Sequence, residues 1–292
     1  MDLKAFAEEV GNQGPVTVVG GRTQWDVGGS VASGTREVRA PAGIVEFEPA
    51  EMTVRCGAGT TVAELDAALG EHGQCVALAG DDGATVGGVL AVGWSGIRRL
   101  RQGPMRDVLL EARYVSGDGR VIKGGGPTVK NVSGFDLCRL LVGSLGTLGF
   151  LGEVVLRCRP RPAESRWFSG AAEPFDLVQR LHQPSAILWD GATTWLLLEG
   201  HPADVEAQGA IAGLAEAAGP PAMPTGGRVS MRPSELRSLT GDFVAEIGVG
   251  VVHTAGPAPK RDLPSDVAAL NRRVKQAFDP NGRLNPGRTV AA

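Results

Sequence analysis

The sequence predicts an α+β protein whose chain changes character near residue 160, and three observations indicate this. Apolar residues recur with helical spacing at residues 3–10, 60–73 and 264–278. Short β-branched runs separated by glycines lie between them and are typical of strands and turns. The sequence RPRP at residues 159–162 interrupts both patterns. We therefore expect a first domain at residues 1–160 and smaller parts after it.

The elements of the first domain follow from local signals. Residues 3–10 suit a short helix, and Thr60 or Thr61 can cap a second helix because Glu64 stands in its first turn. Residues 136–142 suit a third helix. Strands are expected at residues 15–19, 44–47, 52–56, 108–115, 121–122 and 147–156, with a Gly-Asp-Gly turn joining 108–115 to 121–122 as a hairpin.

The remainder of the chain alternates strand and helix signals before one long helix. Strands are expected at 166–169, 187–190 and 194–199, and helices at 174–182 and 202–218. The Pro- and Gly-rich residues 219–233 indicate a linker or exposed loop. Residues 243–253 are a strand candidate, and residues 264–278 a helix that is capped near Asp262.

Composition favours a sizeable core and argues against nucleic-acid binding. The chain has 292 residues, 42% of them hydrophobic, and a formal net charge of −3. Nucleic-acid binders usually carry a basic excess instead. The arginines at positions 98, 99, 101 and 106 are better matched to one small anion, and a solvated surface explains them equally well.

Four cysteines, Cys56, Cys75, Cys138 and Cys158, lie far apart in the sequence. They lack the spacing of an iron–sulfur or zinc site, so we expect no metal in this chain. The first residues are charged and amphipathic rather than a secretion signal, and no apolar run reaches the ~18 residues of a membrane span. We expect a cytoplasmic protein with reduced thiols and no direct membrane insertion.

Glycine-rich motifs carry the functional signal. Glycine has no Cβ, so a ligand can lie against its main-chain amides. Five such motifs are TVGG (85–88), SGIRR (95–99), GPMRD (103–107), KNVSGFD (130–136) and GSLGTLG (143–149). In order and spacing, this set resembles the FAD-binding domain of the vanillyl-alcohol-oxidase (PCMH) type, and more closely the FAD-binding subunits of bacterial glycolate oxidases. Together with matches near both termini, the resemblance covers residues 15–160 and 264–288.

The resemblance implies a PCMH-type fold of two α+β subdomains, about 1–56 and 57–160. A small, shortened α+β cap at 161–230 and a C-terminal segment at 231–292, which returns to the FAD domain, complete the expected organisation. The cap shows no paired histidines.

The loop at residues 20–24 is the expected diphosphate site. A strand followed by two glycines and Thr23 can turn several backbone N–H groups toward one anion, although a hairpin turn has the same pattern. No histidine occurs in the loop, so the resemblance implies non-covalent FAD. The implied cofactor-binding residues are Gly20, Gly21, Arg22, Thr23, Gln24, Thr85, Gly87, Gly88, Ser95, Gly96, Arg106, Asp107, Lys130, Asn131, Gly143, Ser144, Gly146, Thr147, Gly149, Leu151 and Asn285.

Two of these assignments have structural alternatives. Lys130 and Asp136 could equally form an internal pair. The tail around Asn285, which the resemblance places near the flavin ring, also reads as a rigid turn because Pro280 and Pro286 stop regular structure.

Oxidation of a 2-hydroxy acid needs a cation for the carboxylate and a base for the hydroxyl proton. Arg98 and Arg99 are candidates for the cation. His253 is the one histidine that we keep as a base, and a satisfied core histidine is its alternative.

We therefore expect an FAD-dependent oxidoreductase subunit of a glycolate-oxidase-like complex. Its partners would be a second FAD-binding subunit and an iron–sulfur subunit, which could bring it to the inner membrane. A self-sufficient small FAD oxidoreductase and a flavin-free assembly subunit are the alternatives. The shortage of acid–base residues, with Tyr114 the single tyrosine, favours the complex.

Overall fold

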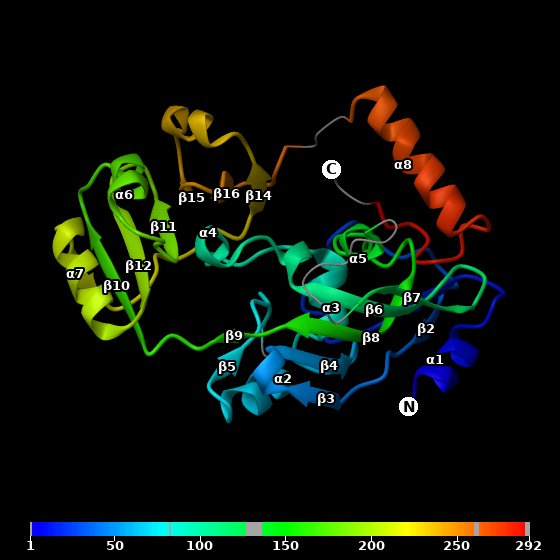
Figure 1. Cartoon of the computed structure of the whole chain (residues 1–292). Coiled ribbons are helices and arrows are strands. Elements are labelled where there is room, and N and C mark those ends of the chain that lie inside the picture. The colour runs from blue at the N-terminus through cyan, green and yellow to red at the C-terminus, as the bar shows by residue number, and fades with distance from the viewer. Residues whose placement is uncertain (1, 82, 127–135, 260–262, 290–292) are drawn as a thin grey trace. The chain divides into compact units, whose positions relative to one another are not determined.

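The computed structural model describes residues 2–81, 83–126, 136–259 and 263–289 (Figure 1). It divides into two compact units. Unit 1 consists of Met1–Gly96, Pro104–Arg161 and Arg261–Ala292, and unit 2 of Ile97–Gly103 and Pro162–Lys260.

A five-stranded antiparallel sheet in the order β3-β4-β8-β6-β7 is the centre of unit 1. One face carries the main core, in which Val54, Tyr114 and Val154 pack against Leu65 and Leu90 of two helices. The hairpin expected from the Gly-Asp-Gly turn is confirmed as β6 and β7. The bounds are β3 Ile44–Glu48, β4 Thr53–Gly57, β6 Leu109–Val115, β7 Val121–Gly125, β8 Phe150–Arg157, α2 Val62–Gly70 and α3 Val86–Val92.

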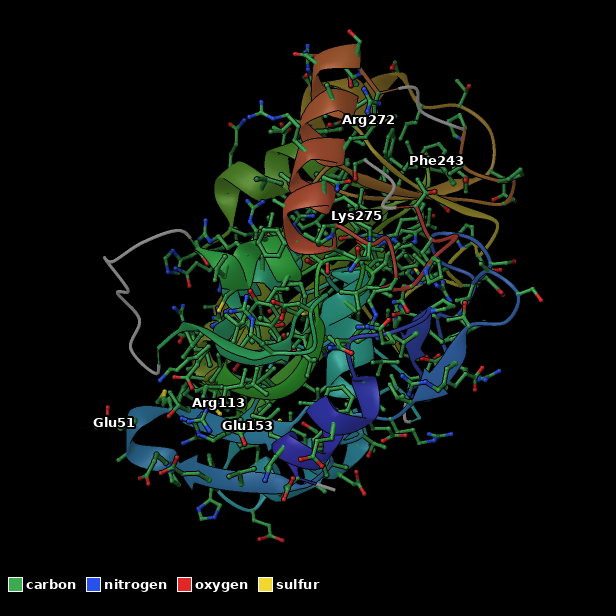
Figure 2. The ribbon with its side chains drawn as sticks, turned by 90° about the vertical axis from the view of Figure 1, so that its right-hand side faces the viewer. Glu51, Arg113, Glu153, Phe243, Arg272 and Lys275 are labelled. Atoms are coloured by element: carbon green, nitrogen blue, oxygen red, sulfur yellow. The ribbon has the colours of Figure 1, made fainter. Side chains whose placement is uncertain are left out.

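Segments from early and late in the chain lie together at a small parallel sheet in unit 1. Strand β1 (Val16–Val18) pairs with β2 (Arg36–Val38), and Val16 also bridges to Leu284 of the tail. Helix α1 (Leu3–Val10) buries Phe6 against this sheet. Helix α8 (Ser265–Phe278) precedes the tail, and its Lys275, labelled in Figure 2, donates to the carbonyls of Thr147 and Leu284. The remaining elements of unit 1 are η1 Pro49–Glu51, β5 Gln74–Cys75, η2 Met105–Asp107, α5 Leu137–Leu141 and β9 Arg159–Pro160.

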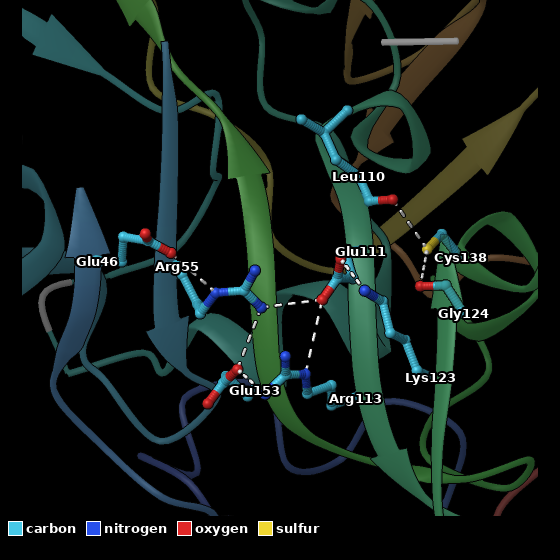
Figure 3. A network of polar contacts seen from close by, with 9 residues as sticks. All are labelled: Glu46, Arg55, Leu110, Glu111, Arg113, Lys123, Gly124, Cys138 and Glu153. Carbon is cyan, nitrogen blue, oxygen red and sulfur yellow. Dashed lines mark hydrogen bonds and ion pairs between the residues drawn. The ribbon is translucent and has the colours of Figure 1, made fainter. Parts of the chain in front are cut away.

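Opposite the main core, the five-stranded sheet carries a network of ion pairs (Figure 3). The Glu111 carboxylate, only 1% exposed, lies 2.9 Å from Arg55 Nη1, 3.0 Å from Lys123 Nζ and 3.6 Å from Arg113 Nε. Glu153 lies 3.2 Å from both Arg55 and Arg113. Burial alone would raise the pKa of Glu111, but hydrogen bonds and charges from Arg55 and Lys123 outweigh it, so this pKa is lowered.

Unit 2 is built on a seven-stranded antiparallel sheet in the order β13-β10-β12-β11-β15-β16-β14. Helices α6 and α7 contact each other and pack on β10, β11 and β12. The bounds are β10 Glu164–Gly170, β11 Ala186–Trp189, β12 Thr194–Gly200, β13 Ala215–Ala217, β14 Gly227–Ser230, β15 Phe243–Glu246, β16 Val251–Thr254, α4 Arg99–Gln102, α6 Pro174–Arg180, α7 Pro202–Ala212 and η3 Pro233–Ser238.

Three expectations for unit 2 were wrong in detail. The helix predicted to reach residue 218 ends at Ala212, because Gly213 takes the left-handed conformation and β13 then pairs with β10. The expected linker contains β14, which pairs with β16. The strand predicted at 243–253 is a hairpin, because Gly248 and Gly250 have φ of 80° and 83°.

Candidate functional site

Two adjoining cavities, of about 100 Å³ and about 270 Å³, lie within unit 1. Their combined volume lies a little above roughly 300 Å³, the lower limit of ordinary ligand and cofactor sites. The residues that line both cavities are Val18, Gly20, Thr85, Gly88, Ala91 and Asn285.

The loop at residues 20–24 forms one wall of the smaller cavity. It follows β1 directly and packs tightly against the chain before α3. A Cβ on Gly21 would lie 1.7 Å from the carbonyl oxygen of Gly83, and a Cβ on Gly20 would lie 2.3 Å from Thr85 Oγ1. Glycine is therefore required at both positions so that the loop can pack against the residues before α3.

Helix α3 lines both cavities. Thr85 is its N-cap, and Thr85 Oγ1 accepts a hydrogen bond from the Gly88 amide at 3.3 Å. A Cβ on Gly87 would lie 2.8 Å from Ala58 Cβ, so this glycine allows close packing. A Cβ on Gly88 would meet only Thr85 Oγ1, at 3.0 Å. The bare side of Gly88 thus faces cavity space.

The loop at residues 143–149 supplies another wall of the larger cavity, through Ser144, Gly146 and Gly149. Two backbone hydrogen bonds hold it to α3, one from Gly143 N to the Leu90 carbonyl and one from Leu145 N to the Ala91 carbonyl. Strand β8 follows and adds Leu151 to the same wall. The glycines after β1, on α3 and in this loop therefore all line the same pair of adjoining cavities.

Asn285 of the C-terminal tail lines both cavities. Its amide Nδ2 donates to the Leu145 carbonyl, while Oδ1 is buried without a hydrogen-bond partner. Thr17 Oγ1, in the wall of the smaller cavity, is also buried and has no partner. Because buried polar atoms are nearly always satisfied, these two oxygens indicate a polar ligand in the cavity.

The charged residues that line the two cavities are all arginines, namely Arg22, Arg39 and Arg288. The chain as a whole is acidic, with a net charge of −3. A cavity with glycine loops, unsatisfied oxygens and positive charge fits a large anionic cofactor such as a dinucleotide.

Family models match the chain in two places. The FAD binding domain matches residues 2–125, and the C-terminal domain of FAD linked oxidases matches residues 234–289. The chain carries the FAD-binding domain and the C-terminal domain of FAD-linked oxidases. Its cofactor is FAD, and its predicted PCMH-type α+β fold is confirmed.

Similar proteins include subunits of glycolate oxidases. The chain is 29% identical over 338 residues to glycolate oxidase subunit GlcE of Escherichia coli, covering 99% of this chain and 96% of that protein. It is 44% identical over 107 residues to a D-lactate dehydrogenase of Archaeoglobus fulgidus, covering 36% of this chain and 24% of that protein. Glycolate oxidase subunit GlcD of Bacillus subtilis is 36% identical over 93 residues, which cover 32% of this chain and 20% of the subunit.

A solved alkyldihydroxyacetonephosphate synthase shares the fold, with a TM-score of 0.67 at 14% identity. The similarity covers 97% of this chain and 72% of the synthase chain.

Thirteen of the predicted cofactor residues line the two cavities: Gly20, Gly21, Arg22, Thr23, Gln24, Thr85, Gly87, Gly88, Ser144, Gly146, Gly149, Leu151 and Asn285. Their contacts with FAD stay a prediction.

Six other predicted residues are not among the lining residues: Ser95, Gly96, Arg106, Asp107, Gly143 and Thr147. Several have structural contacts instead. Ser95 Oγ accepts from the Met105 amide, Asp107 pairs with Arg139, and Thr147 Oγ1 donates to the Ser144 carbonyl. Lys130 and Asn131, and with them the alternative pair of Lys130 and Asp136, lie outside the described residues.

The predicted catalytic residues belong to unit 2. His253 Nε2 lies 2.9 Å from Glu246 Oε1, and the Glu246 side chain is 3% exposed. The Arg98 guanidinium is already bound to the Glu199 carboxylate, at 2.9 Å and 3.1 Å. Arg99 begins α4.

Sequence reasoning missed Arg228 near these residues. It sits opposite His253 in the β14–β16 pair. Burial lowers the pKa of Arg228, and the nearby charges of Glu246 and Arg99 raise and lower it respectively. We missed it because residues 219–233 were expected to form a linker or exposed loop rather than a strand.

In unit 1, sequence reasoning missed Thr17, Trp25, Arg39 and Arg288 as lining residues. Arg288 is the last residue of the stretch 264–288 that the family resemblance covers, and this resemblance, which had drawn attention to Asn285, was the available signal. Across the described ranges, no helix is long and apolar enough to cross a membrane.

Proposed function

We propose that this chain is the FAD-binding subunit of a glycolate-oxidase-type complex and oxidises a 2-hydroxy acid. One observation carries the proposal: the arginine- and glycine-lined hollow with two unsatisfied oxygens lies in a chain that matches a glycolate oxidase subunit over almost its full length. Two of the similar proteins are named D-lactate dehydrogenases, and this supports a 2-hydroxy acid as the substrate class.

The cofactor is held without a covalent bond in this proposal. Covalent attachment of a flavin needs a nucleophilic side chain at the site. The described residues that line the two cavities include no histidine, cysteine or tyrosine. The loop at 20–24, the bare side of Gly88 and the unsatisfied Oδ1 of Asn285 would hold the cofactor by shape, backbone amides and hydrogen bonds.

Bound FAD supplies the hydride acceptor for the acid's Cα hydrogen. The protein must bind the carboxylate and accept the hydroxyl proton. His253 accepts the hydroxyl proton of the acid in this proposal, and the buried carboxylate of Glu246 holds its ring in place. We propose that Arg99 rather than Arg98 binds the substrate carboxylate, because Glu199 already compensates the Arg98 charge.

Partner subunits complete the proposed activity. Outside His253, the histidines have other contacts or lie at the surface. His72 packs edge-on against Phe47, His201 caps α7, and His182 is exposed. A chain so poor in acid–base groups suits a subunit that shares chemistry with a second FAD-binding subunit and passes electrons to an iron–sulfur subunit.

Reduction of the bound flavin by glycolate tests this proposal. FAD absorbance would be followed anaerobically in the isolated chain and in the complex purified through a tag on this chain. We expect bleaching in the complex and an iron–sulfur protein among its subunits. Bleaching of the isolated chain at the rate of the complex would favour a self-sufficient oxidoreductase. A complex that keeps full activity when this chain lacks flavin would favour the assembly role.

A further inference from the structure

The last described residues of unit 1 fold over the segment that follows the 20–24 loop. The Thr289 amide donates to the Gly28 carbonyl, and the Ala32 amide donates to the Pro286 carbonyl. Arg288 therefore lies beside Trp25, although the two are far apart in sequence. Its guanidinium is 4.6 Å from the centroid of the Trp25 ring, and its Nη1 donates to the Val27 carbonyl.

A second guanidinium lies over the same ring. Arg22 is 4.9 Å from the Trp25 centroid, and both arginines line the smaller cavity together with Trp25. The two positive charges are not equivalent. Arg22 Nη2 donates to both oxygens of Glu37 at 2.7 Å, so its charge is compensated within the protein.

Arg288 has no such compensation among the described residues, because none of their carboxylates lies within 4.0 Å of it. Burial lowers the pKa of Arg288, and the charge of Asp26 raises it by less. Among the described residues, none that lines the smaller cavity is acidic. A half-buried cation in such a wall is stabilised most by an anion that enters the cavity.

We propose that Arg288 binds the diphosphate of FAD, with Trp25 holding its guanidinium in place. This inference rests on the FAD site proposed above. In oxidised FAD the diphosphate is the anionic part, and it is the group that glycine loops accept best. The Trp25 face fixes the plane of the Arg288 guanidinium. The N–H groups of the guanidinium lie in that plane and can donate to phosphate oxygens.

The test compares three ligands that separate the diphosphate from the flavin ring. Affinities for FAD, ADP and riboflavin would be measured by calorimetry on flavin-free full-length protein. We expect Arg288→Gln to weaken FAD and ADP roughly 10- to 100-fold, the range for hydrogen bonds to charged groups, and to leave riboflavin unchanged. Arg288→Lys keeps the charge and should recover part of the loss. Trp25→Leu should weaken FAD and ADP by less.

Arg120→Gln is the matched control, because Arg120 is 77% exposed and is not a lining residue of either cavity. It should bind all three ligands like the wild type. Unchanged FAD affinity in Arg288→Gln would overturn the inference, as would an equal loss for riboflavin, which would indicate a general loosening of the tail. If the wild type itself binds no FAD, the proposed function fails as well, so the two failures are distinguishable.

Discussion

Asn285 donates its side-chain amide to the backbone carbonyl of Leu145, a residue 140 positions earlier in the chain. Both residues have positive φ, 45° and 52°, a conformation that non-glycine residues rarely adopt. The tail and the 143–149 loop therefore hold each other in strained conformations at the wall of the smaller cavity, which both residues line. Such strain is found most often where a ligand is positioned.

Replacing Asn285 with Ala should weaken FAD binding. The substitution removes the hydrogen bond to Leu145 and the unsatisfied Oδ1 of a residue that lines both cavities. We expect a loss of roughly tenfold in FAD affinity, the usual value for one hydrogen bond. Fluorescence titration with FAD measures it. Asn271→Ala, on the exposed surface of α8, is the control, and equal affinities in the two variants would contradict the assignment of Asn285.

Filling the space above Gly88 should abolish FAD retention without unfolding the protein. A side chain there meets only Thr85 Oγ1 and otherwise extends toward the cavities. We expect purified Gly88→Val to lack flavin while its thermal unfolding temperature stays within a few degrees of wild type. Gly219→Val, where a Cβ has no neighbour within 4 Å, should retain FAD. Full flavin content in Gly88→Val would refute this placement of the cofactor.

Gly21 is unsuitable for the same test, although it lines the cavity. Any side chain there collides with the Gly83 carbonyl, so the loop would move before a ligand was affected.

The Glu111 network should make stability depend on pH in the acid range. The folded-state pKa of Glu111 is lowered from 4.5, so its ionised form contributes stability above pH 4.5 that is lost as pH falls through the lowered value. Glu111→Gln should destabilise by roughly 3 kcal/mol at neutral pH, because it leaves cations without their buried partner. Urea unfolding at several pH values would show that the difference in free energy of unfolding between wild type and Glu111→Gln becomes smaller in acid.

Glu46→Gln is the control within the same network. Glu46 pairs with Arg55 but is 58% exposed, so its loss should cost less than about 1 kcal/mol at any pH. If the difference in free energy of unfolding between wild type and Glu111→Gln stays constant down to pH values near 3, packing rather than charge is responsible for it.

Three of the four thiols should be inert in the folded protein. Burial raises the pKa of Cys56 and of Cys158 to about 12, and that of Cys138 to about 11. Thiolates are the reactive form, so these cysteines should resist a disulfide reagent at about pH 8. Titration before and after denaturation measures this. Rapid modification of more than one thiol in the native protein would contradict it.

Local signals in the sequence were sufficient for much of the fold. Thr61 and Glu64 form the capping box that begins α2, and both partners lie within one turn. The glycine motifs at 85–88 and 143–149 contribute lining residues to the cavities, whereas the motifs at 95–99 and 103–107 contribute none. Gly213 also signals the end of α7, although we predicted that this helix would reach residue 218.

Long-range pairings could not be predicted in this way. Strand β14 exists because Arg228 pairs opposite His253 on β16, and nothing near Arg228 in the sequence shows that partner. Arg288 stacks on Trp25 from the other end of the chain. The requirement for glycine at position 21 depends on Gly83, which only the folded loop brings near. These features depend on tertiary contacts rather than on propensity.

The flavin content of the purified chain tests the central claim most directly. The protein would be precipitated with acid, and the supernatant and pellet analysed separately for FAD by absorbance and chromatography. We expect a yellow protein that releases one FAD per chain into the supernatant. A colourless protein that takes up no added FAD, or flavin that stays in the pellet, would contradict a non-covalent FAD site between the glycine loops and the tail.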